Sequence, residues 1–225
     1  MTHDSLDATV GAAAMRRAVG ANNEELSASL AELDALRSPH VIQAFRHVDR
    51  GMFVPEADRG EIYEDRPYRR AFAEGEGALH MSAPHMYASS LETLEMEPGS
   101  GHAFLNVGSG TGYFSSLAAF LVGSSGTVHS IEVFPKVVKW SKQRFAEFGA
   151  VPLIPGMPHH GVNRDVLAKD MKWVTGNALA IDVERNCKYD RIYVGAQGVE
   201  DDIRHLMRLL KPGGIMVGPF GAVLY

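Results

Sequence analysis

The sequence predicts an α/β protein with a doubly wound, mostly parallel sheet and an N-terminal helical segment. Short apolar runs alternate with helical stretches through residues 101–225, a pattern typical of parallel strands joined by helices on both faces of a sheet. A glycine-rich turn at 108–112 connects the first of these runs to a helix. The length of 225 residues suits one structural domain with a sizeable core.

The N-terminal hundred residues are expected to be mainly helical. Residues 1–20 are small and polar with no clear period, which predicts a mobile tail. Within 21–100, Asn22 or Asn23 can cap a first helix. The pair at 38–39, serine then proline, has the pattern that begins a second helix.

A segment dense in charged and aromatic side chains follows at 56–76. It is too long and irregular for an ordinary connection, which indicates a functional loop or disorder. Beyond it, Pro84 favours an extended conformation at Ala83. A helix is then expected over residues 85–95.

The stretch from 103 to 132 predicts a nucleoside-binding site. Its elements are a buried strand at 103–107, a helix at 113–121 and a second strand at 127–131 that ends on Glu132. Glycines in the intervening turn permit φ > 0 and let a ligand approach the backbone. The helix that begins there presents unpaired N–H groups, and an acid at the tip of the next strand suits the hydroxyls of a ribose.

The form of the glycine turn narrows the class of nucleoside. A dinucleotide fingerprint expects a third glycine three places after the second, at position 113, where this chain has Tyr113. The G-x-G-x-G pattern found instead is that of S-adenosylmethionine-dependent methyltransferases, whose ligand has an amino-acid tail and no pyrophosphate. A dehydrogenase is therefore a distant alternative.

The remainder of the chain continues the alternation. Residues 135–148 predict a helix, and 199–210 predict another. Residues 151–169, rich in proline, predict an inserted loop. Its pair of histidines, 159–160, lacks acids or cysteines at ligand spacing and is interpreted as solvated loop rather than a metal site. Three further strands are expected. They lie at 172–177, 189–195 and 215–219.

Composition excludes several classes of function. The net charge is −5 and the sequence has no basic stripe that could neutralise phosphates, which argues against nucleic acid as a partner. The single cysteine, Cys187, excludes an internal disulfide and a multi-cysteine metal site, so no metal is expected. No apolar run approaches the ~20 residues of a membrane span, and the acidic N-terminus does not suit a signal peptide. We expect a cytoplasmic monomer that does not bind a membrane.

Several motifs occur in an order that matches a known family. They are the segments 41–45, 48–50, 53–55, 63–67, 81–86, 105–113, 189–192, 195–196 and 210–214. From about residue 30 to 221 the chain resembles the protein-L-isoaspartate (D-aspartate) O-methyltransferases. The resemblance implies a Rossmann-like class I methyltransferase core at 101–225 and a substrate-side loop within 21–100. It also implies S-adenosyl-L-methionine as cofactor, and isoaspartyl-containing proteins or peptides as partners in protein repair.

The resemblance also assigns roles to individual residues. Ser82 would be catalytic, offering its hydroxyl to the substrate carboxylate or the methyl donor, and Ala83, Pro84 and His85 would contact the substrate. The residues alone favour a simpler interpretation, in which Ser82 does no more than cap the following helix. By the same reasoning His85 is interpreted as a packed or capping histidine rather than a base. The cofactor would be held by the turn, by Glu132 at the ribose and by two residues at the adenine. This set is Asn106, Gly108, Ser109, Gly110, Gly112, Glu132, Asn177 and Ala178.

Two substitutions and the position of the last residue depart from the family pattern. Asn106 and Asn177 stand where the family usually has aspartate. Both changes resemble the "domain-containing" branch, whose members bind the cofactor without clear activity and act as ubiquitin-ligase substrate receptors. A weakly active or inactive recognition module is therefore the alternative to an enzyme, although the intact segment 82–85 favours the enzyme. The sequence stops at Tyr225, before the family's last antiparallel strand pair, so we expect either a fragment of a longer protein or a sheet that lacks those strands.

Overall fold

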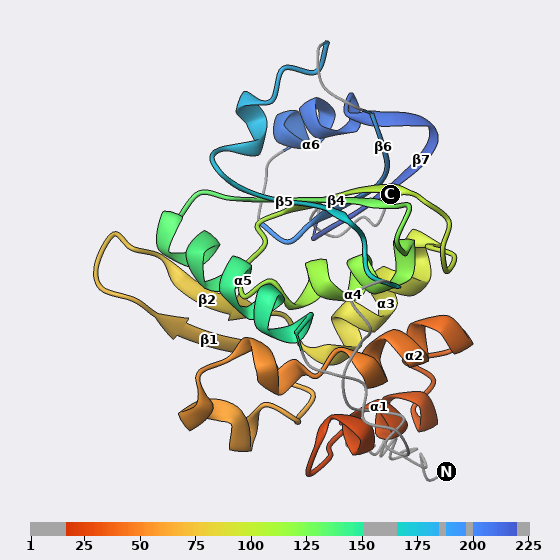
Figure 1. The fold of residues 1–225 in the computed structure, drawn as a ribbon, viewed down its shortest axis with the longest axis vertical. Coiled ribbons are helices and arrows are strands. Elements are labelled where there is room, and N and C mark those ends of the chain that lie inside the picture. The colour runs from red at the N-terminus through yellow and green to blue at the C-terminus, as the bar shows by residue number, and fades with distance from the viewer. Residues whose placement is uncertain (1–16, 151–165, 185–187, 197–199, 220–225) are drawn as a thin grey trace, which may run out of the picture.

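The computed structural model describes residues 17–150, 166–184, 188–196 and 200–219. Within these residues a central parallel sheet lies between helices on both of its faces, and the N-terminal helices add a further layer below (Figure 1). This arrangement confirms the predicted doubly wound α/β fold.

The described part of the sheet contains five parallel strands in the order β5-β4-β3-β6-β7. Their bounds are β3 (Ala103–Val107), β4 (Thr127–Glu132), β5 (Asp170–Thr175), β6 (Tyr189–Val194) and β7 (Leu210–Val217). The chain enters at the centre with β3, winds outward to β5 and then returns to the other side of β3. Because the winding direction reverses between β3 and β6, a ligand crevice is expected outside the carboxyl ends of these two strands.

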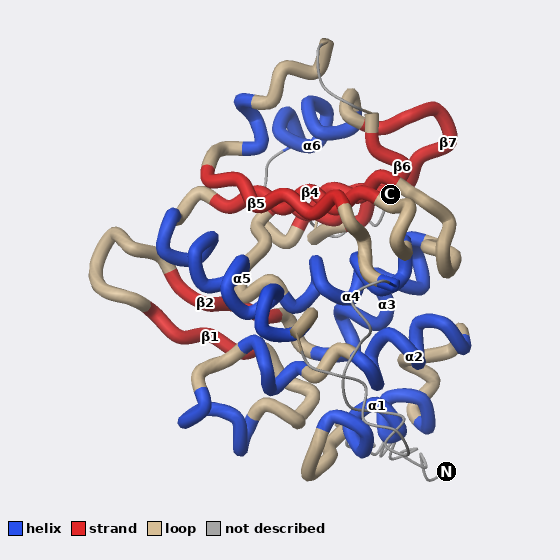
Figure 2. Tube along the Cα trace, viewed as in Figure 1, coloured by secondary structure: helices blue, strands red, loops and turns tan. Residues whose placement is uncertain are grey.

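Helices cover both faces of the sheet. The helices α3 (Pro84–Leu94), α4 (Tyr113–Val122) and α5 (Pro135–Phe148) lie on one face, and α6 (Glu200–Met207) lies on the other (Figures 1 and 2). The buried apolar side chains form one cluster on each side, with Phe104 in the first and Leu105 in the second. This division follows from the alternation of side chains along β3.

The N-terminal helices begin where the sequence predicts. Helix α1 (Asn23–Glu32) is capped by Asn22, whose side chain accepts a hydrogen bond from the Glu25 amide at 3.0 Å. Helix α2 (Pro39–His47) follows Ser38 and buries Val41, Ala44 and Phe45.

The boundary of the predicted tail needs correction at its C-terminal end. Residues 1–16 lie outside the described residues. Ala18, however, is buried, and Val19 forms an isolated antiparallel bridge with Glu64. Packed structure therefore begins by Ala18, because its methyl group joins the core under α1.

An aromatic cluster joins the N-terminal helices to the sheet layer. The ring of Tyr113, at the start of α4, lies 6.3 Å from that of Phe45, 5.5 Å from that of Phe53 and 5.9 Å from that of Tyr87. Edge-to-face and tilted pairs of this kind stabilise beyond their buried area. Tyr113, which occupies the position of the missing third glycine, thus serves the core.

The segment 56–76, expected to be an irregular loop, is largely structured. Two short 3₁₀ helices, η1 (Arg50–Phe53) and η2 (Glu56–Glu61), precede an antiparallel hairpin of β1 (Tyr68–Ala71) and β2 (Ala78–Met81). The Asp58 carboxylate anchors the outer strand, because it accepts hydrogen bonds from the Tyr68 hydroxyl at 2.6 Å and from the Arg70 guanidinium at 2.8 Å. This hairpin becomes a wall of the functional site.

The last described strand also differs from expectation. Residues 211–214, which separate the predicted helix at 199–210 from the predicted strand at 215–219, form a bulge inside β7, since pairing with β6 jumps from Leu210 opposite Tyr189 to Ile215 opposite Arg191. Helix α6 ends at Met207 rather than at 210. No antiparallel strand pairs with this sheet among the described residues.

The histidine pair 159–160 and most of its predicted loop lie outside the described residues. In the part of the chain that the structure describes, no helix is both long and apolar enough to cross a membrane.

Candidate functional site

A cavity of about 620 Å³ opens at the carboxyl edge of the sheet, where the strand order reverses. Its volume lies within the usual range of small-molecule sites. The ends of β3, β4 and β6, the hairpin and α6 all contribute to it. Among its lining residues are Arg69, Ala71, Ala78, His80, Gly108, Gly110, Glu132, Phe134, Asn177, Ala178, Gly195, Ala196 and Asp202.

The glycine turn is in direct contact with the hairpin at Gly110. Gly110 has φ +53°, and a Cβ there would lie 2.4 Å from the His80 carbonyl oxygen. The same carbonyl accepts a hydrogen bond from the Thr111 amide at 3.3 Å. Glycine at 110 therefore allows β2 to lie directly on the turn.

The backbone amides of the turn are less available than the sequence suggests. The amides of Gly108 and Ser109 both donate to the Ile131 carbonyl, at 2.9 and 3.2 Å. The Gly110 amide donates to a carboxylate oxygen of Glu132 at 3.3 Å. Contrary to our expectation of amides freed for a ligand, these three donors hold the turn against the neighbouring strand.

Glu132 is held in a defined orientation at the cavity wall. Besides the Gly110 amide, its carboxylate accepts hydrogen bonds from the amides of Val133 at 2.8 Å and Phe134 at 3.4 Å. The side chain is half-buried. A carboxylate fixed by backbone donors at the tip of β4 is suited to accept hydrogen bonds from a diol.

Asn177 and Ala178 line the cavity beyond the tip of β5. The Asn177 side-chain oxygen accepts a hydrogen bond from the Leu179 amide at 3.0 Å and caps the 3₁₀ helix η4 (Ala178–Ala180). Ala178 is buried and packs with Ile131 in the core under α6. Asn177 thus has a local structural role in addition to its place at the cavity.

The structure brings Gly108, Gly110, Glu132, Asn177 and Ala178 together at the cavity. The other predicted site residues do not line it. These are Ser82, Ala83, Pro84, His85, Asn106, Ser109 and Gly112.

Asn106 and Gly112 support the turn from behind. Asn106 is 1 % exposed, and its amide group donates to the Ser115 hydroxyl at 2.8 Å. Its side-chain oxygen is buried without a hydrogen-bond partner among the described residues. Gly112 is the N-cap of α4 and packs against Ser141 and Trp173. An aspartate at 106 would carry its charge into this interior, at a cost that asparagine avoids.

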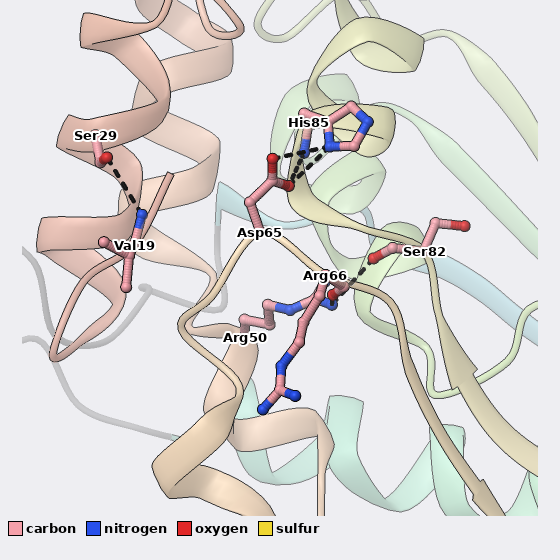
Figure 3. Close-up of polar contacts among 7 residues, drawn as sticks. All are labelled: Val19, Ser29, Arg50, Asp65, Arg66, Ser82 and His85. Atoms are coloured by element: carbon pink, nitrogen blue, oxygen red, sulfur yellow. Dashed lines mark hydrogen bonds and ion pairs between the residues drawn. The ribbon is translucent and has the colours of Figure 1, made fainter. Parts of the chain in front are cut away.

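The backbone of Ser82 is hydrogen-bonded to the interior through both its carbonyl and its amide. The carbonyl accepts a hydrogen bond from the buried Arg50 guanidinium at 3.0 Å (Figure 3). The amide donates to the Tyr87 hydroxyl at 3.0 Å. The Ser82 hydroxyl points away from Arg50 (Figure 3). Burial raises the pKa of the Tyr193 hydroxyl, whereas hydrogen bonding with the Ser82 side chain lowers that pKa. Ser82 is thus held rigidly beside the cavity wall at His80.

Asp65, rather than Ser82, caps helix α3. The Asp65 carboxylate accepts hydrogen bonds from the His85 amide at 2.9 Å and from the His85 ring Nδ1 at 2.8 Å (Figure 3). The N-cap residue itself, Ala83, makes no side-chain cap hydrogen bond. The interpretation of Ser82 as a cap is therefore wrong, whereas His85 takes part in the capping contact.

Replacing Asp65 with alanine is expected to lower the free energy of unfolding by about 1 kcal/mol, the usual value of an N-cap. Urea denaturation of the two proteins measures this difference. His85→Ala is the matched control, because it removes the ring but keeps the backbone donor to Asp65. A loss for His85→Ala that equals or exceeds the loss for Asp65→Ala would contradict the capping role.

The hairpin is fastened over the cavity by the start of α5. The Lys136 ammonium pairs with Glu76 and lies 4.7 Å from the centre of the Phe72 ring. Gly77 contacts Phe134 so closely that a Cβ at 77 would lie 2.4 Å from its ring. These contacts hold the hairpin tip against the residues that follow Glu132.

Sequence reasoning missed several cavity residues. Gly195 and Ala196 follow β6 next to β3, so the rule that ligands bind where the strand order reverses could have identified them. No sequence signal placed His80 or Phe134 at the cavity. Among the described residues, no group of three or more His, Cys, Asp and Glu side chains could hold a metal ion.

A doubly wound parallel sheet, a glycine turn after its first strand and an acid at the tip of the next define a Rossmann-like class I methyltransferase fold. The sequence model of the protein-L-isoaspartate(D-aspartate) O-methyltransferases matches residues 21–224. The chain therefore belongs to this family, as its motifs suggested.

Two similar proteins, one from an archaeon and one from a plant, are named protein-L-isoaspartate O-methyltransferases. A protein-L-isoaspartate O-methyltransferase of Methanothrix thermoacetophila is 34% identical over 187 residues, which cover 82% of this chain and 75% of the relative. One from Arabidopsis thaliana is 31% identical over 204 residues, covering 89% and 78% respectively. These relatives are named as enzymes and do not support the alternative of an inactive recognition module.

Solved structures share the fold. A Plasmodium falciparum protein assigned as a protein-L-isoaspartate O-methyltransferase, solved with S-adenosyl-L-homocysteine, aligns with a TM-score of 0.67 at 22% identity. The alignment covers 91% of this chain and 88% of that one. A second protein-L-isoaspartate O-methyltransferase aligns with the same TM-score at 24% identity and covers 88% and 55%. At these identities the likeness concerns the fold alone.

Proposed function

We propose that this protein transfers a methyl group from S-adenosyl-L-methionine to the carboxylate of L-isoaspartyl or D-aspartyl residues in damaged proteins. One observation carries the proposal: Gly110, Glu132 and Asn177 line a single cavity at the reversal point of the sheet. His80, two residues before Ser82, lines the same cavity. Family membership supports the choice of acceptor.

The residues of the cavity fit an adenosyl cofactor. Ile131, Ala178 and Leu179 offer apolar surface for the adenine, and Glu132 offers a fixed acceptor for the ribose hydroxyls. The turn lines the cavity at Gly108 and Gly110, and the amino-acid tail would lie beside these residues. When bound, the cofactor would supply an electrophilic methyl group on a sulfonium.

The acceptor needs little acid–base assistance from the protein. A carboxylate with an ordinary pKa of about 4 is already ionised near neutrality. Alignment of the reacting groups can supply on the order of 7 kcal/mol or more. The task of this chain is therefore to orient the acceptor and to exclude water, for which the fastened hairpin and the rigid Ser82 segment are suited.

The decisive assay is labelled methyl transfer to an isoaspartyl peptide, set beside the same peptide with a normal aspartyl residue. We expect label on the isoaspartyl peptide and none on its twin. Equal labelling of both peptides would contradict the acceptor class. Binding of S-adenosylhomocysteine without any methyl transfer would instead favour a recognition module.

Replacing Ser82 with alanine is expected to lower kcat/KM for the isoaspartyl peptide about tenfold, the value of one hydrogen bond to a charged group. Affinity for S-adenosylhomocysteine should stay within about twofold, because the backbone contacts of Ser82 persist. Ser89→Ala, at an exposed position of α3, is the matched control. An unchanged kcat/KM in Ser82→Ala would remove the hydroxyl from the mechanism.

A further inference from the structure

One face of the hairpin looks into the cavity. In the antiparallel register Arg69 lies opposite His80, and Ala71 lies opposite Ala78. Because side chains alternate along a strand, these four residues share one face, and all four line the cavity. The opposite face carries Leu79, which is buried in the interior.

Arg69 is the one lysine or arginine among the described residues that line the cavity. The carboxylic side chains of that lining are Glu74, Glu132 and Asp202. Burial, together with the charges of Arg69 and Arg50, lowers the pKa of His80, so this histidine is neutral near pH 7. An anionic ligand group in the cavity therefore has Arg69 as its cationic partner.

Arg69 also differs from the cations around it, because it has no ion-pair partner among the residues that the structure describes. Arg66 pairs with Glu61 and Glu64, Arg70 pairs with Asp58, and Lys136 pairs with Glu76. These contacts span 2.5 to 3.2 Å. The exposed Arg69 guanidinium makes no ion pair or hydrogen bond within the described part of the chain. Its five donors remain available to a ligand.

A carboxylate at the glycine turn needs such a donor. The amides of Gly108 and Ser109 are engaged by the Ile131 carbonyl, and the amide of Gly110 faces Glu132. The hairpin residue that touches this turn is His80, whose carbonyl accepts from Thr111, and Arg69 is its cross-strand neighbour. The guanidinium therefore projects from the wall that adjoins the turn.

We propose that Arg69 binds the carboxylate of the cofactor's amino-acid tail. The inference rests on the proposed function and adds to it a residue outside the glycine turn. A planar guanidinium matches a carboxylate in a bidentate pair, which a lysine ammonium cannot reproduce. The adenosine part of the cofactor, held by Glu132 and the apolar wall, does not require Arg69.

Calorimetric titration with two ligands tests the assignment without any catalytic readout. S-adenosylhomocysteine carries the carboxylate, whereas 5′-methylthioadenosine keeps the adenosine and the sulfur but lacks the amino-acid tail. We expect Arg69→Ala to weaken S-adenosylhomocysteine about tenfold and methylthioadenosine less than about twofold. Arg69→Lys should recover part of the loss, and the difference should shrink at high salt.

Arg70→Ala is the matched control, because Arg70 points to the other face of the hairpin and pairs with Asp58. Any loosening of the hairpin in that variant should affect both ligands equally. Thermal melting checks that each variant is folded.

The outcomes separate this inference from the proposed function. If the unaltered protein does not bind S-adenosylhomocysteine, both are overturned. If it binds, but Arg69→Ala weakens both ligands equally or neither, only the Arg69 assignment is overturned. A raised KM for the isoaspartyl peptide with unchanged S-adenosylhomocysteine affinity would assign the guanidinium to the acceptor instead and would also overturn it.

Discussion

Replacing Gly110 with alanine is expected to lower the free energy of unfolding by roughly 3 kcal/mol, of which 1–2 come from the left-handed backbone and the rest from a clash. Gly110 has φ +53°, and the added methyl would lie 2.4 Å from the His80 carbonyl oxygen. The Cβ is fixed by the backbone of residue 110 and the oxygen belongs to the backbone of His80, so no side-chain rotation can relieve the clash. Urea denaturation measures the loss, and binding of S-adenosylhomocysteine should fall with it because β2 must move off the turn.

Gly99→Ala separates the two parts of this effect. Gly99 has φ +68°, and a Cβ there meets nothing within 4 Å. The variant should therefore lose only the backbone part, roughly 1–2 kcal/mol. An equal loss in the two variants would show that His80 does not press on the turn as the structure indicates.

Replacing Glu132 with glutamine is expected to weaken S-adenosylhomocysteine about 100-fold, since two hydrogen bonds from ribose hydroxyls lose their charged acceptor. Glutamine keeps one oxygen, which can still accept from the amides of Val133 and Phe134, and it loses only the 3.3 Å contact that the other carboxylate oxygen makes with the Gly110 amide. Thermal melting of the variant checks that the turn is still folded, so that the loss in calorimetric affinity reports the altered acceptor rather than a collapsed site.

Glu147→Gln is the control for Glu132→Gln, because Glu147 is exposed on α5, away from the cavity lining, and pairs with Arg144. Its affinity for S-adenosylhomocysteine should match that of the unaltered protein. Should Glu132→Gln also bind normally, the acid at the tip of β4 would have no part in holding the nucleoside.

The parallel core could be predicted because its signals are local. The strands at 103–107 and 127–132 are short apolar runs, and a glycine turn followed by a helix separates them. Asn22 and Pro39 mark the beginnings of α1 and α2 through capping and proline geometry. Glu132, Asn177 and two glycines of the turn, Gly108 and Gly110, reach the cavity because the carboxyl ends of neighbouring parallel strands share one edge.

The wall formed by the hairpin could not be predicted, because its partners are distant or atypical. The strands β1 and β2 are four residues each, and β1 is exposed and rich in arginine, unlike a typical strand. The cap of α3 comes from Asp65, twenty residues upstream of His85. The role of the Ile131 carbonyl as acceptor for the turn amides likewise depends on the register between β3 and β4.

The aromatic cluster around Tyr113 has a thermodynamic consequence. One continuous set of buried side chains includes Leu30 of α1, Phe45 of α2 and Val128 of β4. Elements that share a core in this way unfold together rather than piece by piece. A ligand that binds at the edge of the sheet therefore stabilises the N-terminal helices against unfolding as well, although none of their residues lines the cavity.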